Sequence, residues 1–475
     1  MENEPLGDIS PEEFERGASF VVEWMKTYLD RDTRPEPVLS RLEPGSIRAG
    51  QKAEPPLDGE SPEMVLREFQ EQLSDGLTHW NSPRFFAYFS ISASGPGVLA
   101  DFLSSGLNQQ AMLWRTSPVA TELEEVTLDW LRQGLGLPDP FRGVIYDTAS
   151  VSTLHALATA REVALPDIRQ CGQAGRRPVV YCSEHTHSSV DKSILMLGLG
   201  MDYLRKIECD EKLAMRPEKL RQAIQADREA GLIPIAAVAT TGTTSTATID
   251  PVDSIAGICA EEGIWLHVDA AYGGAAALLP EMRHLFRGWE RADSIVFNHH
   301  KWMFTPFDCS VLYLRDIEEL CRAFSLTPEY LKNSEQGRAL NLMDTGVQLG
   351  RRFRSLKLWM IFRCFGLNGM RERISYHLDL ARYFASLVEQ SAQFELALPV
   401  NLSLVCFRMK DGDDERQLQL MEAVNREGKF FLSHTKVFER IVLRCAIGNI
   451  RTARSDVEQF FKALQAASTQ LSTSA

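Results

Sequence analysis

Between residues 95 and 320 the chain alternates short runs of β-branched and other apolar residues with longer stretches of helical spacing, and this alternation restricts the possible folds most strongly. The predicted strands are 143–146, 178–181, 235–240, 265–269, 294–298 and 310–314, and the predicted helices include 150–164 and 251–262. Such alternation predicts an α/β fold with a parallel or mixed sheet and helices on both faces. Ligands of these sheets bind at the carboxyl ends of the strands.

Two amphipathic helices are predicted before this region. Ser10, followed by Pro11 and by Glu13, has the pattern of a capping box, and the helical spacing continues to about residue 29. A second helix is predicted to start at Ser61, and the stretch 31–60, rich in Pro and Gly, is predicted to be an extended connection without a core element. Two helices on so long an arm cannot bury their apolar faces on each other alone, so we expect them to lie on another subunit or on the main body.

The sequence after residue 320 predicts a loop and a smaller unit. Residues 324–348 are polar and weakly periodic, which is typical of a functional or disordered loop. Helices are predicted around 355–365 and 368–390. Strands around 402–407 and 441–446 are then predicted to surround a helix over 414–427.

Composition excludes several classes of partner. The chain has 475 residues and a net charge of −13, from 51 basic and 64 acidic side chains, and this field repels nucleic acid and anionic membranes. Nine scattered cysteines show no C-x-x-C pair and no metal-type spacing, which is typical of reduced intracellular thiols. The acidic N-terminus resembles no signal peptide, and no stretch is apolar enough to cross a bilayer. We predict a cytoplasmic protein with no metal site, no nucleic-acid partner and no membrane partner.

Two predicted strands end in groups that can act together. Strand 265–269 ends in Asp269, and strand 294–298 is followed by His299, His300 and Lys301. Taken alone, Asp269 is typical of a turn cap and Lys301 of a solvated loop, and adjacent histidines diverge too much to favour a metal. Taken together, they indicate a cofactor with an aldehyde and a pyridine nitrogen, because a lysine forms a Schiff base and an acid keeps the ring nitrogen protonated.

Other strand ends offer sites for the remaining groups of such a cofactor. Strand 143–146 leads into Asp147-Thr148-Ala149-Ser150 and a helix, where free N–H groups can bind a phosphate or where the chain has only a plain N-cap. The hydroxyls of 240–245 could reach a ring substituent or could belong to a polar turn. His187 could stack on a ring face, although a hydrogen-bonded core histidine is the commoner fate.

With these segments in this order, the chain resembles the group II pyridoxal-phosphate decarboxylases, specifically the aromatic L-amino-acid decarboxylases, from about residue 14 to about residue 466. The segments that carry the resemblance are 84–89, 117–124, 148–150, 187–190, 267–272, 298–302 and 350–355. The resemblance implies the PLP-dependent transferase-like fold type I, with a large domain built on a mostly parallel seven-stranded sheet. It also implies a homodimer with active sites at the interface. The expected parts are an N-terminal helical arm (1–92), a large PLP-binding domain (93–367) and a small C-terminal α+β domain (368–475).

The resemblance also implies pyridoxal 5'-phosphate (PLP) as the cofactor and a role for several residues. Lys301 matches the Schiff-base lysine, Asp269 the partner of the pyridinium, His187 the residue stacked on the ring, and Tyr330 the catalytic tyrosine of a mobile loop. The expected cofactor-binding residues are Ala149, Ser150, Thr240, Asp269, Ala271, Asn298, His300 and Lys301, with the phosphate assigned to Ala149, Ser150 and Asn298.

The implied reaction is decarboxylation of an aromatic L-amino acid (tryptophan, tyrosine, phenylalanine or dopa) to an arylalkylamine and CO2. Gly350 matches the glycine typical of the aromatic enzymes. Tyr88, Phe89 and, from the other subunit, Met112 and Trp114 are expected to form the walls of the substrate pocket, or alternatively to fill a dimer core. The sequence departs from the family at His299 (usually Pro), Ile91 (Thr in the animal enzymes) and Met112 (Phe in the animal enzymes).

Three alternatives remain open at this point. One is an aromatic aldehyde synthase or a decarboxylase of a non-aromatic amino acid, although Tyr330 favours plain decarboxylation. Another is a scaffold without cofactor, which the presence of Lys301, Asp269 and His187 disfavours. The third is a nicotinamide oxidoreductase, which the lack of a Gly-rich fingerprint after the first strand disfavours.

Overall fold

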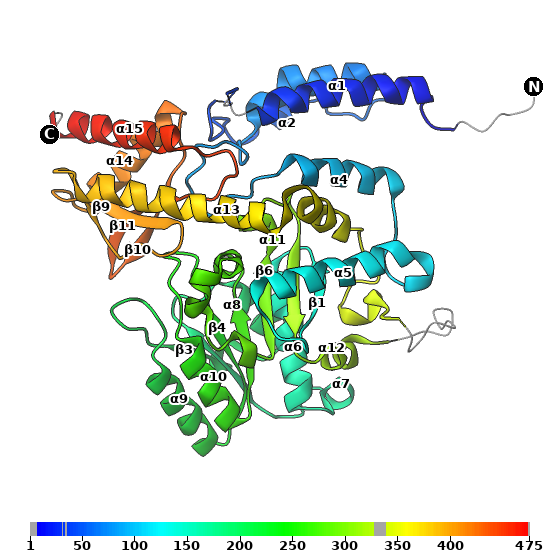
Figure 1. Cartoon of the computed structure of the whole chain (residues 1–475), viewed down its shortest axis with the longest axis vertical. Helices are drawn as coiled ribbons and strands as arrows, with labels where there is room; N and C mark the ends of the chain where they lie inside the picture. The colour runs from blue at the N-terminus through cyan, green and yellow to red at the C-terminus, as the bar shows by residue number, and fades with distance from the viewer. Residues whose placement is uncertain (1–6, 31, 34–35, 327–338, 474–475) are drawn as a thin grey trace, which may run out of the picture.

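A computed structural model describes residues 7–30, 32–33, 36–326 and 339–473 (Figure 1). Its large sheet has seven strands in the order β1-β7-β6-β5-β4-β2-β3. The strands are β1 (Arg142–Tyr146), β2 (Pro178–Ser183), β3 (Leu204–Ile207), β4 (Ile233–Thr240), β5 (Trp265–Asp269), β6 (Ser294–Asn298) and β7 (Ser310–Leu314). Only β7 runs opposite to the other six strands, so the prediction of a mostly parallel seven-stranded sheet is confirmed.

Burial explains which strands the sequence revealed. Strands β5, β6 and β7 have the predicted bounds, and every residue in them is buried, as strands covered on both faces require. Strand β3 was not predicted, because it has only four residues, lies at the sheet edge and buries only its first and last residues.

Helices cover both faces of the large sheet. On one face, α6 (Ala149–Ala164) and α8 (Ser189–Met196) pack against Val144, Val180 and Val238. On the other face, α5 (Pro118–Leu135), α9 (Pro217–Glu229) and α10 (Val252–Glu262) enclose the largest hydrophobic core. Shorter helices are α7 (Ile168–Cys171), α11 (His299–Trp302) and α12 (Ile317–Phe324). This layered arrangement places the carboxyl ends of β4, β5 and β6 side by side.

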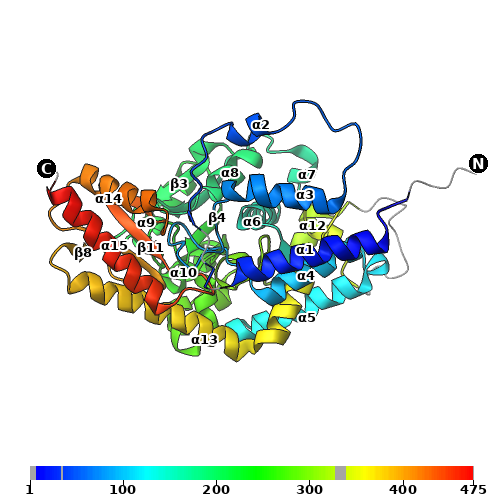
Figure 2. The ribbon, with the colours of Figure 1, turned by 90° about the horizontal axis from the view of Figure 1, so that it is seen from above.

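The N-terminal arm contains the predicted helices. Helix α1 (Pro11–Leu29) starts with the predicted capping box at Ser10, and α3 (Pro62–Glu68) continues into a π-helical turn over Phe69–Leu73. The two helices lie side by side (Figure 2) and leave Phe14, Val22 and Met64 exposed. A short helix, α2 (Ser46–Gly50), lies between them in the sequence.

The prediction that 31–60 contributes nothing to a core is wrong at Val38. This side chain is fully buried in a cluster with Phe85 and Phe431. Its backbone is fixed as well, because the Val38 N–H donates to the Gly428 carbonyl and the Val38 carbonyl accepts from His79.

The predicted loop 324–348 is only partly described, since residues 327–338 lie outside the described residues. The prediction of an irregular loop is wrong for 342–345, which form a short 3-10 helix with Leu342, Met343 and Thr345 buried. Met343 and Leu113 pack in one small apolar cluster, a contact between segments more than 200 residues apart that sequence spacing cannot reveal.

The C-terminal unit has an antiparallel sheet in the order β10-β11-β9-β8. Its strands are β8 (Phe394–Leu396), β9 (Leu404–Met409), β10 (Ser433–Val437) and β11 (Arg440–Ala446). Helices α14 (Asp414–Glu427), α15 (Arg454–Thr473) and the second half of α13 (Ser355–Glu389) contribute to its separate core. Helix α13 joins this unit to the large sheet (Figure 1) and is kinked at Gly366, beside the predicted boundary at 367.

Helix α4 (Gly95–Leu107) packs against α13 and exposes Leu99, Phe102, Leu103 and Leu107 to solvent. Within the described ranges, no helix has the combination of length and apolar character that a bilayer crossing requires.

Candidate active site

A cavity of about 200 Å³ lies at the carboxyl ends of β4, β5 and β6. The residues that line it are Thr148, Ala149, Ser150, His187, Ser189, Thr240, Gly242, Thr244, Asp269, Ala271, Tyr272, Asn298, His300 and Lys301. All eight residues predicted to bind the cofactor are among them, and so is His187. The structure therefore brings together the strand-end residues that the sequence singled out.

Asp269 and Lys301 come from neighbouring strands. Asp269 ends β5 opposite Thr240 of β4, and its Oδ1 accepts the N–H of Ala271 at 3.0 Å. Lys301 lies in α11, which begins directly after β6. Desolvation lowers the pKa of Lys301, and the nearby Asp269 carboxylate acts in the opposite direction. A lowered pKa favours the neutral amine, which is the nucleophilic form of a lysine.

The start of α6 forms one wall of the cavity. Thr148 is its N-cap residue, and no side chain caps the first turn. The N–H groups of Ala149 and Ser150 therefore lie uncapped at the end of the helix that borders the cavity. A helix of 16 residues with a free N-terminus attracts an anion through these donors and its dipole.

Two buried polar atoms of the cavity lack partners. Within the described part of the chain, Thr240 Oγ1 and Asn298 Oδ1 have no hydrogen-bond partner, although both residues are almost fully buried. Unpaired buried groups are rare because they cost about 1–3 kcal/mol each. With an amine, an acid and an anion site around them, these orphaned atoms fit a pyridoxal phosphate.

Asp250 supports this site, although sequence reasoning missed it. Its carboxylate accepts the backbone N–H of Thr240 at 2.8 Å and that of Met215 at 2.7 Å, which fixes the end of β4. Burial raises the pKa of Asp250 to about 6, and Asp269 contributes to this shift. In the sequence, Asp250 before Pro251 is indistinguishable from an ordinary turn residue.

Two histidines at the cavity are held in defined tautomers. His187 Nδ1 accepts the Ser189 N–H at 3.1 Å, and His300 Nδ1 accepts the Cys309 N–H at 3.0 Å. A neutral ring whose Nδ1 is an acceptor carries its proton on Nε2. Burial lowers the pKa of both rings, that of His300 to about 3, so both are neutral at pH 7. Each ring therefore keeps an N–H donor at Nε2.

Of the predicted pocket walls, Phe89 alone is shown near Lys301. Its ring stacks on Tyr272 with centroids 3.6 Å apart, and Lys301 Nζ lies 5.4 Å from its centroid. Tyr88 is half exposed, with its ring stacked on Trp80 instead. Met112 packs beside Leu113 and Met343. None of Tyr88, Met112, Trp114 and Gly350 lines the cavity within the chain as described, and Tyr330 lies outside the described residues.

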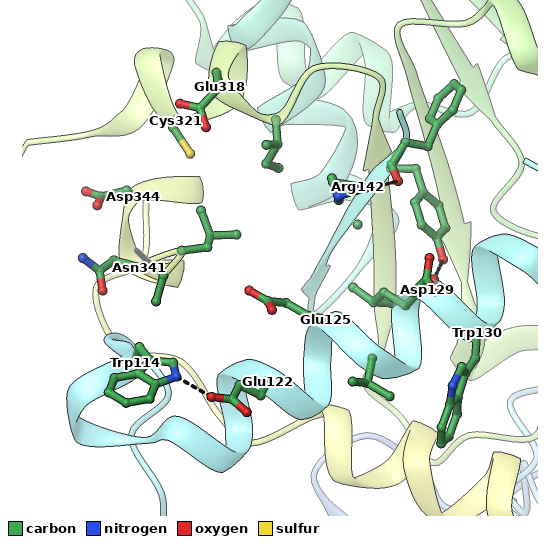
Figure 3. Close-up of a pocket in the computed structure, with 18 of the residues that line it drawn as sticks. Trp114, Glu122, Glu125, Asp129, Trp130, Arg142, Glu318, Cys321, Asn341 and Asp344 are labelled. Carbon is green, nitrogen blue, oxygen red and sulfur yellow. Dashed lines mark hydrogen bonds between the residues drawn. The ribbon is translucent and has the colours of Figure 1, made fainter. Parts of the chain in front are cut away.

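Trp114 lines a different and larger cavity of about 1060 Å³, between α5 on one side and α12 with residues 339–344 on the other (Figure 3). Its Nε1 donates to Glu122 at 2.7 Å. The charged residues labelled there are mainly acidic (Figure 3): Glu122, Glu125, Asp129, Glu318 and Asp344, with Arg142. Its described lining contains no lysine, so the amine chemistry belongs to the smaller cavity.

Arg444 is a buried cation close to the site. It donates to the carbonyls of Thr244 and Ser245 and to Ser433 Oγ, and it lies 5.6 Å from the centroid of Phe89. Burial lowers its pKa. These bonds join the small sheet to the rim of the cavity.

A seven-stranded mostly parallel sheet with a lysine, an acid and a helix N-terminus around one cavity defines a PLP-dependent enzyme of fold type I. The comparisons agree, since residues 44–410 match the family model described as "Pyridoxal-dependent decarboxylase conserved domain". The chain belongs to this family, and its relatives place it among the aromatic-L-amino-acid decarboxylases. It is an amino-acid decarboxylase whose cofactor is PLP.

Three relatives illustrate this likeness. Phenylacetaldehyde synthase of Arabidopsis thaliana is 40% identical, over 94% of this chain and 93% of the relative. Tyrosine decarboxylase 4 of Petroselinum crispum is 38% identical, over 97% and 94%. The crystal structure of Oryza sativa TDC with PLP and tryptamine superimposes with a TM-score of 0.95 at 35% identity, over 98% of this chain and all of that one.

Proposed function

We propose that the enzyme removes the α-carboxylate of an aromatic L-amino acid, such as tryptophan, tyrosine, phenylalanine or dopa, and releases the arylalkylamine and CO2. The observation that carries this proposal is the cavity in which Lys301, Asp269 and His187 meet. The aromatic substrate is supported by relatives named for tyrosine and tryptophan, including a structure that holds tryptamine.

Nine of the lining residues have a proposed task. Lys301 supplies the amine for the cofactor's aldehyde, and the Asp269 carboxylate holds a proton on the pyridine nitrogen. Ala149, Ser150 and Asn298 bind the phosphate, while Thr240, Ala271 and His300 contact the rest of the cofactor. When bound, PLP supplies a sink for the electrons that are left behind as CO2 departs. The neutral His187 ring covers the cavity and helps to exclude water from it.

The proton that replaces the carboxylate has two proposed donors. We propose that Tyr330 delivers it to the substrate's Cα and that the Nε2–H of His187 assists. Lys301 would hold the aldehyde of the cofactor between turnovers. We expect Tyr330→Phe to lose most amine formation while PLP binding persists.

We also propose that the enzyme is a homodimer. The exposed apolar side chains of α4, together with Phe14, Val22 and Met64 of the arm, support a second copy as their cover. The cavity of the chain as described is not lined by Met112, Trp114 or Gly350. We propose that these three residues complete the cavity of the other subunit. In that cavity, Tyr88 and Phe89 would face the substrate ring. The nine free thiols support a cytoplasmic location.

A second candidate function is aromatic aldehyde synthesis, in which decarboxylation is coupled to oxidation by O2 and yields an aldehyde, ammonia and peroxide. The observation that favours it is the 40% identity with a phenylacetaldehyde synthase. A decarboxylase of a non-aromatic amino acid has no comparable support.

One experiment separates these functions. PLP-loaded enzyme is incubated with a panel of L-amino acids, and CO2, amine, aldehyde, ammonia and peroxide are quantified. We expect CO2 and amine in equal amounts from aromatic substrates alone. Lys301→Ala should lose activity and the visible absorbance of bound PLP, whereas Lys410→Ala, a lysine of the small domain, serves as the matched control. Peroxide in equal amount to CO2 would establish the aldehyde synthase, and turnover of aliphatic or acidic substrates alone would contradict both.

A further inference from the structure

Lys357 of α13 is the one lysine in the described part of the chain whose side chain is fully buried. Its Nζ donates to the carbonyl of Pro306 at 3.1 Å and to that of Asp308 at 2.9 Å. The Asp101 carboxylate of α4 lies 3.3 Å away. A buried ammonium is costly unless it is paired and hydrogen-bonded, so Lys357 depends on these two carbonyls and on the Asp101 carboxylate to remain charged inside the protein.

The two carbonyls belong to the turn that leaves the active site. This turn, residues 303–309, connects α11, which carries Lys301, to β7. Its first part is held by α4, since the Ser94 N–H donates to the Phe304 carbonyl and a Cβ on Gly97 would lie 2.3 Å from Pro306. Its last part is held by α13, through Lys357 and through the Arg354–Asp308 ion pair at 2.7 Å.

The turn 303–309 fixes the orientation of the His300 ring. The Cys309 N–H follows directly on the Asp308 carbonyl that Lys357 holds, and it is the donor to His300 Nδ1. Phe307 lies against the same ring, with centroids 4.8 Å apart. An ion pair from Asp101 to Lys357, followed by hydrogen bonds through the turn, therefore leads to a histidine that lines the cofactor cavity.

We propose that Lys357 is a positioning residue, which holds the turn 303–309 so that His300 and Phe307 keep their places beside the cofactor cavity. Lys357 touches neither substrate nor cofactor and acts through the two backbone carbonyls. The inference rests on the proposed function only in taking His300 as a cofactor contact. Helix α13 thereby links the small domain to the geometry of the site.

The test uses the full-length enzyme and compares Lys357→Met with Arg408→Met. Arg408 is a matched control because it is also a buried cation that donates to a turn carbonyl, that of Gly412, but in the small domain. The dissociation constant for PLP is measured by absorbance titration, KM and kcat with one aromatic substrate, and Tm at saturating PLP. Both variants should lower Tm.

We expect Lys357→Met to raise the PLP dissociation constant about tenfold and to raise KM, while Arg408→Met changes both by less than about twofold. Asp101→Asn, which keeps Lys357 and its carbonyl bonds, should shift both constants in the same direction by a smaller factor. It decides the question if Lys357→Met fails to fold. Wild-type values for PLP binding and KM in a folded Lys357→Met, or in Asp101→Asn when that variant alone folds, would overturn the proposal. A wild-type enzyme without turnover would contradict the proposed function alone, since the PLP titration would still report on Lys357.

Discussion

Glu124 and Arg351 form a buried ion pair that binds backbone groups of β1 at one edge of the large sheet. Strand β1 is an edge strand and pairs with β7 alone. The outward N–H of Ile145 donates to Glu124 Oε1 at 2.8 Å, and its carbonyl accepts from Arg351 Nη2. The two side chains are 3.0 Å apart and almost fully buried. One ion pair thus satisfies both edge groups of a residue that stands just before the Thr148–Ser150 turn.

We predict that Glu124→Ala destabilises the fold strongly. The substitution leaves the Arg351 charge buried without a counter-ion, and breaking a buried pair in this way costs about 3–5 kcal/mol. It also leaves the Ile145 N–H without its acceptor, in a place that water does not reach. Glu124→Gln keeps an oxygen for Ile145 and should cost less. Because β1 leads into the proposed phosphate site, PLP affinity should fall in Glu124→Ala as well.

The assay is thermal unfolding at one fixed PLP concentration, since bound ligand stabilises the folded state by mass action. Glu261→Ala is the matched control: it removes a carboxylate from an exposed pair with Arg221 at 2.6 Å, which is expected to contribute about 0–1 kcal/mol. We expect the Tm to fall in the order Glu124→Ala, Glu124→Gln, Glu261→Ala, with the largest loss first. A Tm for Glu124→Ala equal to that of Glu261→Ala would refute the reasoning that the buried pair stabilises the sheet edge.

Three further predictions concern buried groups around α11. His299 is fully buried, both its ring nitrogens lack partners within the described residues, and burial lowers its pKa to about 3. His299 takes up a proton near pH 6.5 in the unfolded chain and only near pH 3 in the folded chain, so its contribution to stability is full above pH 6.5 and is lost as the pH falls. His299→Leu should raise Tm at pH 7 and flatten the acid limb of a Tm–pH profile. An unchanged acid limb would contradict this prediction. Trp302→Phe removes the bond from Trp302 Nε1 to His377 Nδ1, 2.9 Å long and buried, so urea unfolding should show a loss of about 1–3 kcal/mol. Gly97→Ala places a Cβ against Pro306 and should weaken PLP binding in the same direction as Lys357→Met, whereas Gly106→Ala, with open space around its Cβ, should leave PLP binding at the wild-type value.

Local patterns in the sequence determined six of the seven strands of the large sheet and the residues that line the smaller cavity. The buried strands β5, β6 and β7 are short and mostly apolar runs, so their positions follow from composition. Asp269 and Lys301 end or follow such runs, and parallel strands deliver their ends to one edge of the sheet. The capping box at Ser10 is equally local, because all its bonds lie within four residues.

Tertiary structure decided what depends on distant contacts. The sequence analysis did not single out Lys357, which is buried because α4 and the turn 303–309 close over it. Trp114 and Lys301 line separate cavities of this chain, although the sequence predicted both as active-site residues. The Glu124–Arg351 pair joins residues 227 positions apart. Periodicity and caps report only on neighbours along the chain, whereas the burial of a charge and the lining of a cavity are set by whichever segments the fold brings against them.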